Sequence, residues 1–222
     1  MNLALFDLDG TLIEQDSDHA FGEFMVKLGW VDAAEHGRRN DAFYRQYQAG
    51  CLDIAAYIDF ATAPWRNRPP GEQRLASERF MAEVIHPLLR REARELIESH
   101  RRSGDRLAIV TATNEFITRP IAQAFGVRDL IAVELVRDAA GCVTGAIQGT
   151  PSYREGKIAR VDQWLAASGL RWTDFERTLF YSDSTNDLPL LERASDPVAT
   201  NPSPALEAIA LERGWRSLRL FQ

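Results

Sequence analysis

Residues 3–21 read LALFDLDGTLIEQDSDHAF, an apolar run that ends on two carboxylates. The run from Leu3 to Phe6 predicts a buried strand, and Asp7 and Asp9 follow it with a single residue between them. In an extended chain this spacing points both side chains to the same face. Two carboxylates held this close repel each other, and one pKa rises unless a cation lies between them. The stretch therefore predicts a bound cation, although a strand followed by a plain Asp-Gly turn explains DLDGT equally well.

The composition is that of a globular protein with a substantial core. The chain has 222 residues, of which 45% are hydrophobic and 26% charged, enough for one large domain or a core with an insert. Its net charge of −6 offers no basic field, so we expect neither nucleic acid nor a membrane as a partner. The cysteines Cys51 and Cys142 are far apart and indicate neither disulfide nor zinc site. Without a signal-peptide pattern or a membrane-spanning apolar run, we expect a cytoplasmic monomer or homodimer.

The order of the predicted elements indicates an α/β fold. Almost a hundred residues of helix and loop pattern separate the first strand from the apolar run DRLAIVTAT, which begins at Asp105. Beyond it, strands alternate with helices, as is typical of a parallel sheet with helices on both faces. We predict a Rossmann-like three-layer α/β/α core from residues 1–13 and 87–222, with a helical cap of residues 14–86 above the carboxyl ends of the strands, where ligands collect. The expected cap and core helices include 18–28, 32–49, 52–61, 72–84 and 87–103, and a hairpin is expected over 130–147.

Four stretches at this edge carry side chains suited to chemistry: DLDGT, IVTATNE, REGKIARV and FYSDSTNDLPLL. Thr111 can donate to a bound oxyanion, Lys157 is one of only two lysines, and Asp183 and Asp187 share a face if a helix has already begun. Each has a simpler explanation when taken alone, such as a strand threonine, a solvated lysine or helix-capping residues. Together they place four carboxylates and one ammonium at one edge, which predicts a site for a hard divalent cation, Mg²⁺.

These stretches resemble, in this order, the four motifs of the haloacid dehalogenase-like (HAD) superfamily. FDLDGTL matches the first motif, Thr111 after an apolar strand the second, GK at Lys157 the third, and SDSTND the fourth. The resemblance is strongest to the phosphoserine-phosphatase-like branch (subfamily IB), which carries a helical cap between the first two motifs. It spans residues 2 to about 202. Ser182 departs from the pattern, since many members have Gly before the metal-binding Asp.

The resemblance implies a Mg²⁺-dependent phosphatase that hydrolyses a small phosphorylated metabolite through an aspartyl-phosphate. Asp7 would be the nucleophile, and Asp9 the general acid and then the base for the hydrolytic water. Thr111 and Lys157 would hold the phosphoryl oxygens. The remaining implied roles are metal binding by Asp7, Asp9 (through its backbone carbonyl) and Asp183, support of the lysine or the metal's water shell by Asp187, and substrate contacts from Gly10 and Ala112.

Physical chemistry agrees with these roles. A carboxylate, with an ordinary pKa of about 3.9, is ionised at neutral pH, so Asp7 needs no base to activate it. Its approach to a phosphate dianion costs several kcal/mol at low dielectric unless a metal and an ammonium neutralise the charge. An acid at position 9 favours rapid turnover of the acyl-phosphate, whereas the related ion pumps carry Thr there.

Substrate selection is expected in the cap. In phosphoserine-specific relatives an acidic residue at the position of Asp16 receives the substrate's amino group, which implies an amine-bearing substrate such as phosphoserine or histidinol phosphate. Ser17 and Asp18 are more simply explained as helix-capping residues, and His19 as a partly buried structural histidine. Nothing in the sequence selects among three candidate clamps for a substrate carboxylate, Arg45, Arg66 and Arg68.

Two other functions remain open. A phosphotransferase or mutase would use the same chemistry, but no pattern marks a second phosphate-binding site. A non-catalytic module that senses phosphate or Mg²⁺ would be favoured if a motif residue were missing, and none is.

Overall fold

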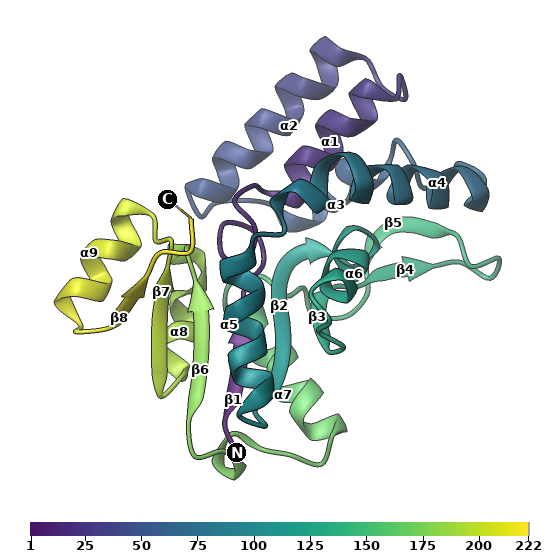
Figure 1. Cartoon of the computed structure of the whole chain (residues 1–222). Coiled ribbons are helices and arrows are strands. Elements are labelled where there is room, and N and C mark those ends of the chain that lie inside the picture. The colour runs from purple at the N-terminus through teal and green to yellow at the C-terminus, as the bar shows by residue number, and fades with distance from the viewer. Residues whose placement is uncertain (222) are drawn as a thin grey trace.

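A six-stranded parallel sheet forms the centre of the computed structural model, which describes residues 1–221 (Figure 1). The strand order is β3-β2-β1-β6-β7-β8, so the first strand of the chain lies in the middle of the sheet. Leu5 of this strand lies opposite Ala108 on one side and Phe180 on the other. The strands are β1 (Leu3–Phe6), β2 (Arg106–Asn114), β3 (Leu130–Val133), β6 (Thr178–Ser182), β7 (Asp196–Thr200) and β8 (Arg216–Leu218).

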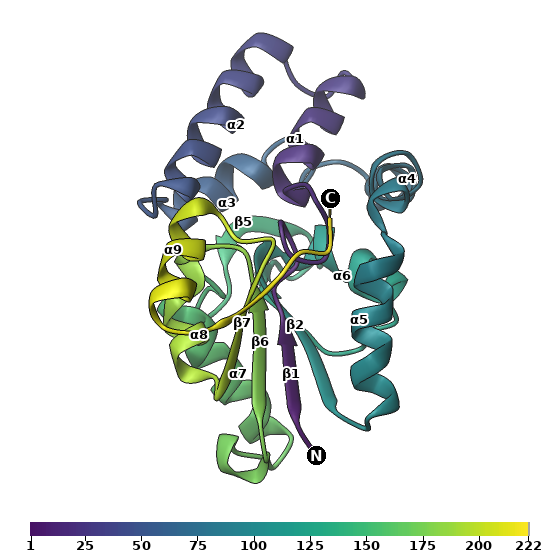
Figure 2. The ribbon, with the colours of Figure 1, turned by 60° about the vertical axis from the view of Figure 1, so that its left-hand side comes forward.

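Helices cover both faces of the sheet, as Figure 2 shows. Alternate residues of β1 enter two separate apolar clusters, because successive side chains of a strand point to opposite faces. Ala4 and Phe6 pack in the cluster that contains α5 and α6, whereas Leu3 and Leu5 pack in the cluster that contains α7, α8 and α9. The predicted three-layer α/β/α class is confirmed. These helices are α5 (Arg91–Arg102), α6 (Glu115–Ala124), α7 (Glu155–Ala167), α8 (Leu188–Arg193) and α9 (Pro204–Glu212).

A helical segment inserted between β1 and β2 lies above the carboxyl ends of the strands (Figures 1 and 2). We call it the cap and keep for it the predicted range 14–86, whose boundaries stay a prediction. Its last helix runs directly into a short π-helix, Met81–Ile85, and a 3-10 turn, His86–Leu88. The cap helices are α1 (Ser17–Lys27), α2 (Ala33–Gln48), α3 (Ile54–Thr62) and α4 (Pro70–Phe80).

Three sequence predictions differ from the structure. The helix expected over 87–103 begins only at Arg91. Arg90 has an extended backbone (φ −66°, ψ 149°), which is not helical. Only the second part of 130–147 forms the expected hairpin, from β4 (Leu135–Arg137) and β5 (Val143–Ile147), while β3 joins the main sheet. β8 was not expected, since a three-residue edge strand with exposed side chains carries little apolar pattern.

Within the described residues, no helix combines the length and apolar character needed to cross a membrane.

The cap packs on the core through a pair of stacked aromatic rings. Trp65, which follows α3, is fully buried, and its indole ring lies 4.1 Å from the ring of Phe116 on α6, at an angle of 15°. Its Nε1 donates a hydrogen bond to the carbonyl oxygen of Ala61 at 3.0 Å. The stacked rings of Trp65 and Phe116 therefore hold the cap on the core by dispersion.

Replacing this ring should destabilise the protein strongly. We expect Trp65→Ala to lower the free energy of unfolding by about 3–5 kcal/mol, because it removes a large buried ring and leaves a cavity. Leu75→Ala, at a cap residue that is 57% exposed, should change it by less than about 0.5 kcal/mol. Urea unfolding of both variants measures the difference, and equal effects would contradict this account of cap packing.

Candidate active site

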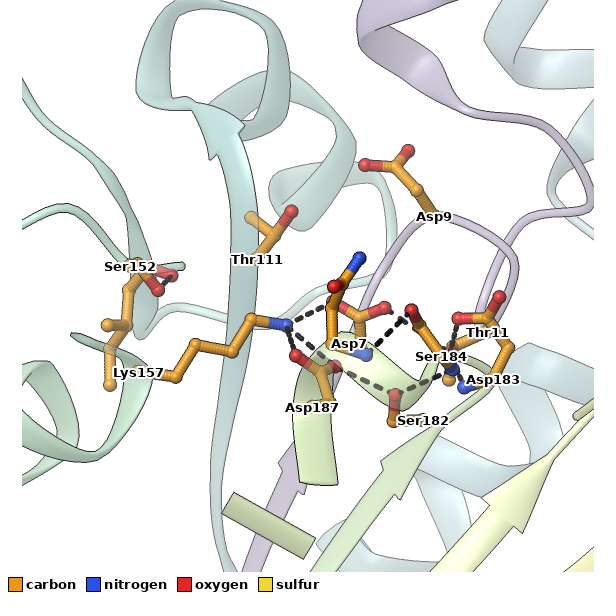
Figure 3. Close-up of polar contacts among 12 residues, drawn as sticks. Asp7, Asp9, Thr11, Thr111, Ser152, Lys157, Ser182, Asp183, Ser184 and Asp187 are labelled. Atoms are coloured by element: carbon orange, nitrogen blue, oxygen red, sulfur yellow. Dashed lines mark hydrogen bonds and ion pairs between the residues drawn. The ribbon is translucent and has the colours of Figure 1, made fainter. Parts of the chain in front are cut away.

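One buried ammonium joins two buried carboxylates at the carboxyl edge of the sheet (Figure 3). Lys157 Nζ lies 2.8 Å from Asp7 Oδ1 and 2.7 Å from Asp187 Oδ1, and none of the three side chains is more than 4% exposed. Asp7 directly follows β1, and Asp187 ends the 3-10 turn Thr185–Asp187 after β6. Residues 150 positions apart in the sequence thus meet in one ion cluster.

Steric crowding explains why glycine precedes the lysine in the GK motif. Lys157 lies in the first turn of α7, where a Cβ added at Gly156 would lie 2.1 Å from the carbonyl oxygen of Pro151. Real Cβ atoms do not approach a backbone oxygen this closely, so only glycine fits without moving the helix start. The glycine therefore fixes where the following lysine enters the sheet edge.

Burial and charge oppose each other at this cluster. Burial raises the pKa of Asp7 to about 7; Lys157 lowers it, and the like charge of Asp187 raises it. Burial disfavours the charged form of Lys157, but Asp187 and Asp7 outweigh this and raise its pKa. The lysine is therefore a permanent cation, and it does not fully offset the carboxylates around it.

Ser182 supports Asp187. Its hydroxyl donates a hydrogen bond to Asp187 Oδ2 at 2.7 Å. The residue that departs from the family pattern thus contributes a contact that glycine lacks. Asp187 supports the lysine, which was one of its two expected roles.

Asp183 faces the DGT loop rather than the lysine. Thr11 Oγ1 donates to Asp183 Oδ1 at 3.2 Å, and the backbone N–H of Asp183 donates to the same hydroxyl at 3.1 Å. Gly10 has a φ of +74°, and a Cβ there would lie 2.4 Å from Asp183 Oδ2, so this position requires glycine. Ser184 caps the 3-10 turn, so Asp183 precedes the helical residues and does not share a helix face with Asp187.

Asp7 and Asp183 are the side chains suited to holding a divalent cation. Thr11 Oγ1 lies between them, 3.5 Å from Asp7 Oδ2 and 3.2 Å from Asp183 Oδ1. Burial raises the pKa of Asp183 well above its ordinary value, and the charges of Asp7 and Asp187 add to this. Among residues 1–221 no basic side chain pairs with Asp183, and no three His, Cys, Asp or Glu side chains gather as a metal cluster. The two carboxylates are hard oxygen ligands of the kind that Mg²⁺ prefers.

Asp9 is held apart from the lysine by two hydrogen bonds. The backbone N–H of Ser17 donates to its Oδ1 at 2.7 Å, and Thr113 Oγ1 donates to its Oδ2 at 2.8 Å. Burial and the charge of Asp16 raise the pKa of Asp9 to about 7, against the lowering by Ser17 and Thr113. A carboxyl group with a pKa near neutrality can both give and take a proton.

Thr113 and Asn201 are site residues that the sequence analysis missed. Thr113 lies two positions after Thr111, on the same face of the extended chain, so the spacing T-A-T was the available signal. Asn201, at the end of β7, donates from Nδ2 to the carbonyl oxygens of Gly10 at 3.0 Å and Thr11 at 3.1 Å. It fixes the DGT loop from a strand end that carried no recognisable motif.

A cavity of about 480 Å³ lies between the cap and the core. Asp7 and Asp9 line it, whereas Gly10 and Asp183 line an adjoining hollow. Lys157 reaches the site from behind Asp7. The other core residues that line the cavity are Thr111, Ala112 and Thr113, and the cap residues are Asp16, Asp18, His19, Asn40, Phe43, Tyr44, Tyr47, Leu52, Ile54 and Tyr57.

Asp16 is the N-cap of α1. Its Oδ1 accepts hydrogen bonds from the backbone N–H groups of Asp18 at 3.0 Å and His19 at 2.8 Å. The capping role expected for Ser17 and Asp18 therefore falls to Asp16, since the helix begins one residue earlier than expected. His19 is partly buried and lies 2.9 Å from Asp41.

None of the three candidate carboxylate clamps lines the cavity. Arg66 pairs with Asp59 at 2.6 Å, and Arg68 pairs with Glu72 at 3.0 Å. Arg45 also lies outside the lining, and no lysine or arginine of the described chain belongs to it.

Comparison with known proteins gives four findings. The haloacid dehalogenase-like hydrolase family matches residues 4–192. The histidinol-phosphatase of Neisseria meningitidis serogroup C (strain 8013) is 47% identical over 214 residues, which cover 96% of each chain. A solved structure from Bordetella pertussis Tohama I, of a protein with unknown function, is 47% identical with a TM-score of 0.93 and covers 99% of both chains. A substrate-bound phosphoserine phosphatase, 18% identical, shares the fold with a TM-score of 0.68 over 97% of this chain and 91% of that one.

The family match extends over most of the chain, and both 47% identities run along nearly its whole length. The chain belongs to the haloacid dehalogenase-like hydrolases and is an enzyme of the phosphatase type.

Proposed function

We propose that the protein is a Mg²⁺-dependent phosphatase that hydrolyses a small phosphomonoester through an aspartyl-phosphate on Asp7. The observation that carries this proposal is the buried cluster in which Lys157 lies 2.8 Å from Asp7 while Asp9 stays outside the ion pair. A carboxylate nucleophile paired with an ammonium and a second carboxyl group outside that pair, free to give and take a proton, are the two groups that such a reaction needs.

The first step transfers the phosphoryl group to the enzyme. A carboxylate oxygen of Asp7 attacks phosphorus, the ester P–O bond breaks, and protonated Asp9 gives its proton to the departing alkoxide. Lys157 and the hydroxyl of Thr111 hold phosphoryl oxygens. Asp7, Asp183 and the backbone carbonyl of Asp9 would hold Mg²⁺, which would supply the positive charge that lets two anions approach.

The second step restores the enzyme. Water gives a proton to the carboxylate of Asp9 while its oxygen attacks phosphorus, and the acyl-phosphate P–O bond breaks. Inorganic phosphate leaves, and Asp7 is again a carboxylate. Thr113 and Ser17 hold Asp9 in place for both proton transfers, because each donates to one of its oxygens.

The cavity favours a substrate that carries an amine and no carboxylate. Asp16 and Asp18 line it, and no lysine or arginine among the described residues does. The carboxylate of phosphoserine would therefore face like charges without a partner. Histidinol phosphate carries an amine and an imidazole instead, and the relative at 47% identity is named a histidinol-phosphatase. We propose histidinol phosphate as the substrate. No feature of the cavity favours a mutase or a phosphate sensor.

Removing the nucleophile should abolish turnover. We expect the wild type with Mg²⁺ to release inorganic phosphate from histidinol phosphate with a higher kcat/KM than from phosphoserine or p-nitrophenyl phosphate. Asp7→Asn should lower kcat by at least about a thousandfold, because an amide is a poor nucleophile. Glu212→Gln, an exposed change at the end of α9, serves as the control. Equal rates for the wild type and Asp7→Asn would disprove the proposed mechanism.

Stability should depend on pH and Mg²⁺ together. The folded-state pKa values of Asp7 and Asp9, about 7, lie above the ordinary value, so protonation favours the folded state. Their contribution to the free energy of unfolding is fully present below about pH 4 and is lost as the pH rises through 7. The loss is up to about 1.4 kcal/mol per group for each pH unit.

The unfolding midpoint of EDTA-treated protein should thus fall between pH 5 and 8. Mg²⁺ should raise it more at pH 8 than at pH 5.5, because the cation binds the ionised carboxylates. Asp183→Asn should lose most of this increment. Identical midpoints with EDTA and with Mg²⁺ at pH 8 would contradict the metal assignment.

Removing the hydroxyl of Thr113 should change the pKa of Asp9. Its hydrogen bond favours the charged form of Asp9, so Thr113→Val should raise the pKa of Asp9. The limb of the kcat/KM profile that reports protonated Asp9 should move upward by about one pH unit. Thr144→Val, at an exposed position of β5, should leave the profile unchanged. A profile that does not move in Thr113→Val would remove Asp9 from the acid role.

A further inference from the structure

Asp18 is a buried carboxylate that the fold itself does not use. It lies in the first turn of α1, is 5% exposed, and lines the cavity. Its Oδ2 has no hydrogen-bond partner within residues 1–221, and no basic side chain pairs with it there. A buried carboxylate without a partner costs stability, so the position is explained by a ligand rather than by folding.

The two simpler explanations for Asp18 fail. Helix capping belongs to Asp16, whose Oδ1 already accepts two backbone hydrogen bonds. The reaction itself uses Asp7 and Asp9, and Lys157 contacts neither Asp16 nor Asp18. Asp18 therefore lines the cavity without a role in helix capping or in the proposed reaction.

The same cavity reaches both the reacting carboxylate and Asp18. Asp7 and Asp18 line it together with two tyrosines, Tyr47 and Tyr57. A ligand whose phosphate lies at Asp7 can therefore extend to Asp18 within one cavity.

The Asp18 end has further unused polar capacity. Asn114, at the end of β2, is fully buried, and neither its amide oxygen nor its amide nitrogen has a hydrogen-bond partner in the described chain. Burial raises the pKa of Asp18, and Tyr57 and Asn114 are the polar side chains that lower it. Phe43 and Ile54 add apolar wall to the same cavity. Such a combination suits a flat ring that carries N–H groups.

We infer that Asp18 binds the imidazole ring of the substrate, while Asp16 receives the amine. This inference rests on the proposed function. In histidinol phosphate the amine lies on the carbon next to the phosphorylated methylene, and the ring lies one methylene further away. Asp16 directly precedes Ser17, whose backbone N–H donates to Asp9 Oδ1 at 2.7 Å, so Asp16 lies next to the reacting end. An N–H of the ring then donates to Asp18 Oδ2, and the carboxylate favours the protonated, cationic ring.

Substrate variation separates ring recognition from general damage. L-histidinol phosphate carries amine and ring, O-phosphoethanolamine carries the amine alone, and p-nitrophenyl phosphate carries neither. We expect Asp18→Asn to raise KM for histidinol phosphate at least about tenfold more than KM for O-phosphoethanolamine. Glu23→Gln removes an exposed charge from the same helix and should leave both KM values unchanged.

A stability measurement excludes a purely structural role. Burial raises the pKa of Asp18 well above its ordinary value. Asp18→Asn replaces this buried carboxyl group by an amide of the same shape, so it should weaken substrate binding without lowering the thermal unfolding midpoint of the ligand-free protein. A structural residue would behave in the opposite way, with a lower midpoint and an equal loss on all three substrates, and that result would overturn the inference.

The inference and the proposed function can fail separately. If the wild type hydrolyses histidinol phosphate but Asp18→Asn raises KM equally for both amine substrates, the inference is wrong and the proposed function stands. If the wild type hydrolyses none of the three, the proposed function is wrong, and calorimetric titration with L-histidinol decides the role of Asp18. Binding at least about tenfold weaker in Asp18→Asn than in the wild type then supports it, and equal binding refutes it.

Discussion

The ion pair that Lys157 makes with Asp7 and Asp187 sets the arrangement of the whole site. Three segments far apart in the sequence must converge for it: the end of β1, the turn after β6, and the first turn of α7. The strand order places β1 next to β6, which brings the two carboxylates to one edge. Gly156 lets α7 begin close to the Pro151 carbonyl, where no Cβ fits, and this helix start places Lys157 beside the two carboxylates. Losing the ammonium would leave two buried like charges together, at a cost of about 3–5 kcal/mol.

The same cluster leaves the site with excess negative charge, and this excess explains the rest of its chemistry. One lysine faces Asp7 and Asp187, while Asp9, Asp16, Asp18 and Asp183 have no basic partner in the described residues. The excess divides into two parts. The carboxylates around Asp7 and Asp183 lie where a divalent cation is proposed, and Asp16 and Asp18 lie where the nitrogen groups of the substrate are proposed. With both proposals, the acidic cavity would select a substrate that is anionic at one end and cationic at the other.

Local patterns made the reactive centre predictable from the sequence. An apolar run followed by Asp7 and Asp9, and a GK pair at a helix start, are short-range signals whose geometry follows from strand and helix periodicity. The supporting contacts were not predictable in this way. Thr113 holds Asp9 and Asn201 holds the DGT loop across separate strand ends, whereas Ser182 holds Asp187 within the turn after β6. Their residue types are common in turns and strands, so only the sheet order reveals what they contact.

The short strands differ from the sequence prediction for a related reason. β3, with four residues, was expected to pair within the hairpin over 130–147, and β8, with three residues, was not expected. Runs this short show no clear period, and pairing with a longer neighbour decides which sheet each strand joins. At the start of α1, Asp16, Ser17 and Asp18 are all good capping residues, so composition alone could not choose among them. The backbone made the choice: Asp16 is extended, with φ −76° and ψ 112°, and its carboxylate turns back onto the helix. That single choice frees Asp18 for the cavity.

The cap is tied to the catalytic machinery through backbone carbonyl groups. Asn186, next to Asp187, donates to the carbonyl oxygen of Tyr47 at 2.8 Å, and Arg154, near Lys157, donates to that of Gly50 at 2.7 Å. Tyr47 also lines the cavity. Any movement of this part of the cap away from the core must break both hydrogen bonds, which belong to the two segments that carry the ion cluster. Cap closure and the ordering of the catalytic residues are therefore mechanically linked, because the loops that hold Asp187 and Lys157 are also the loops on which the cap rests.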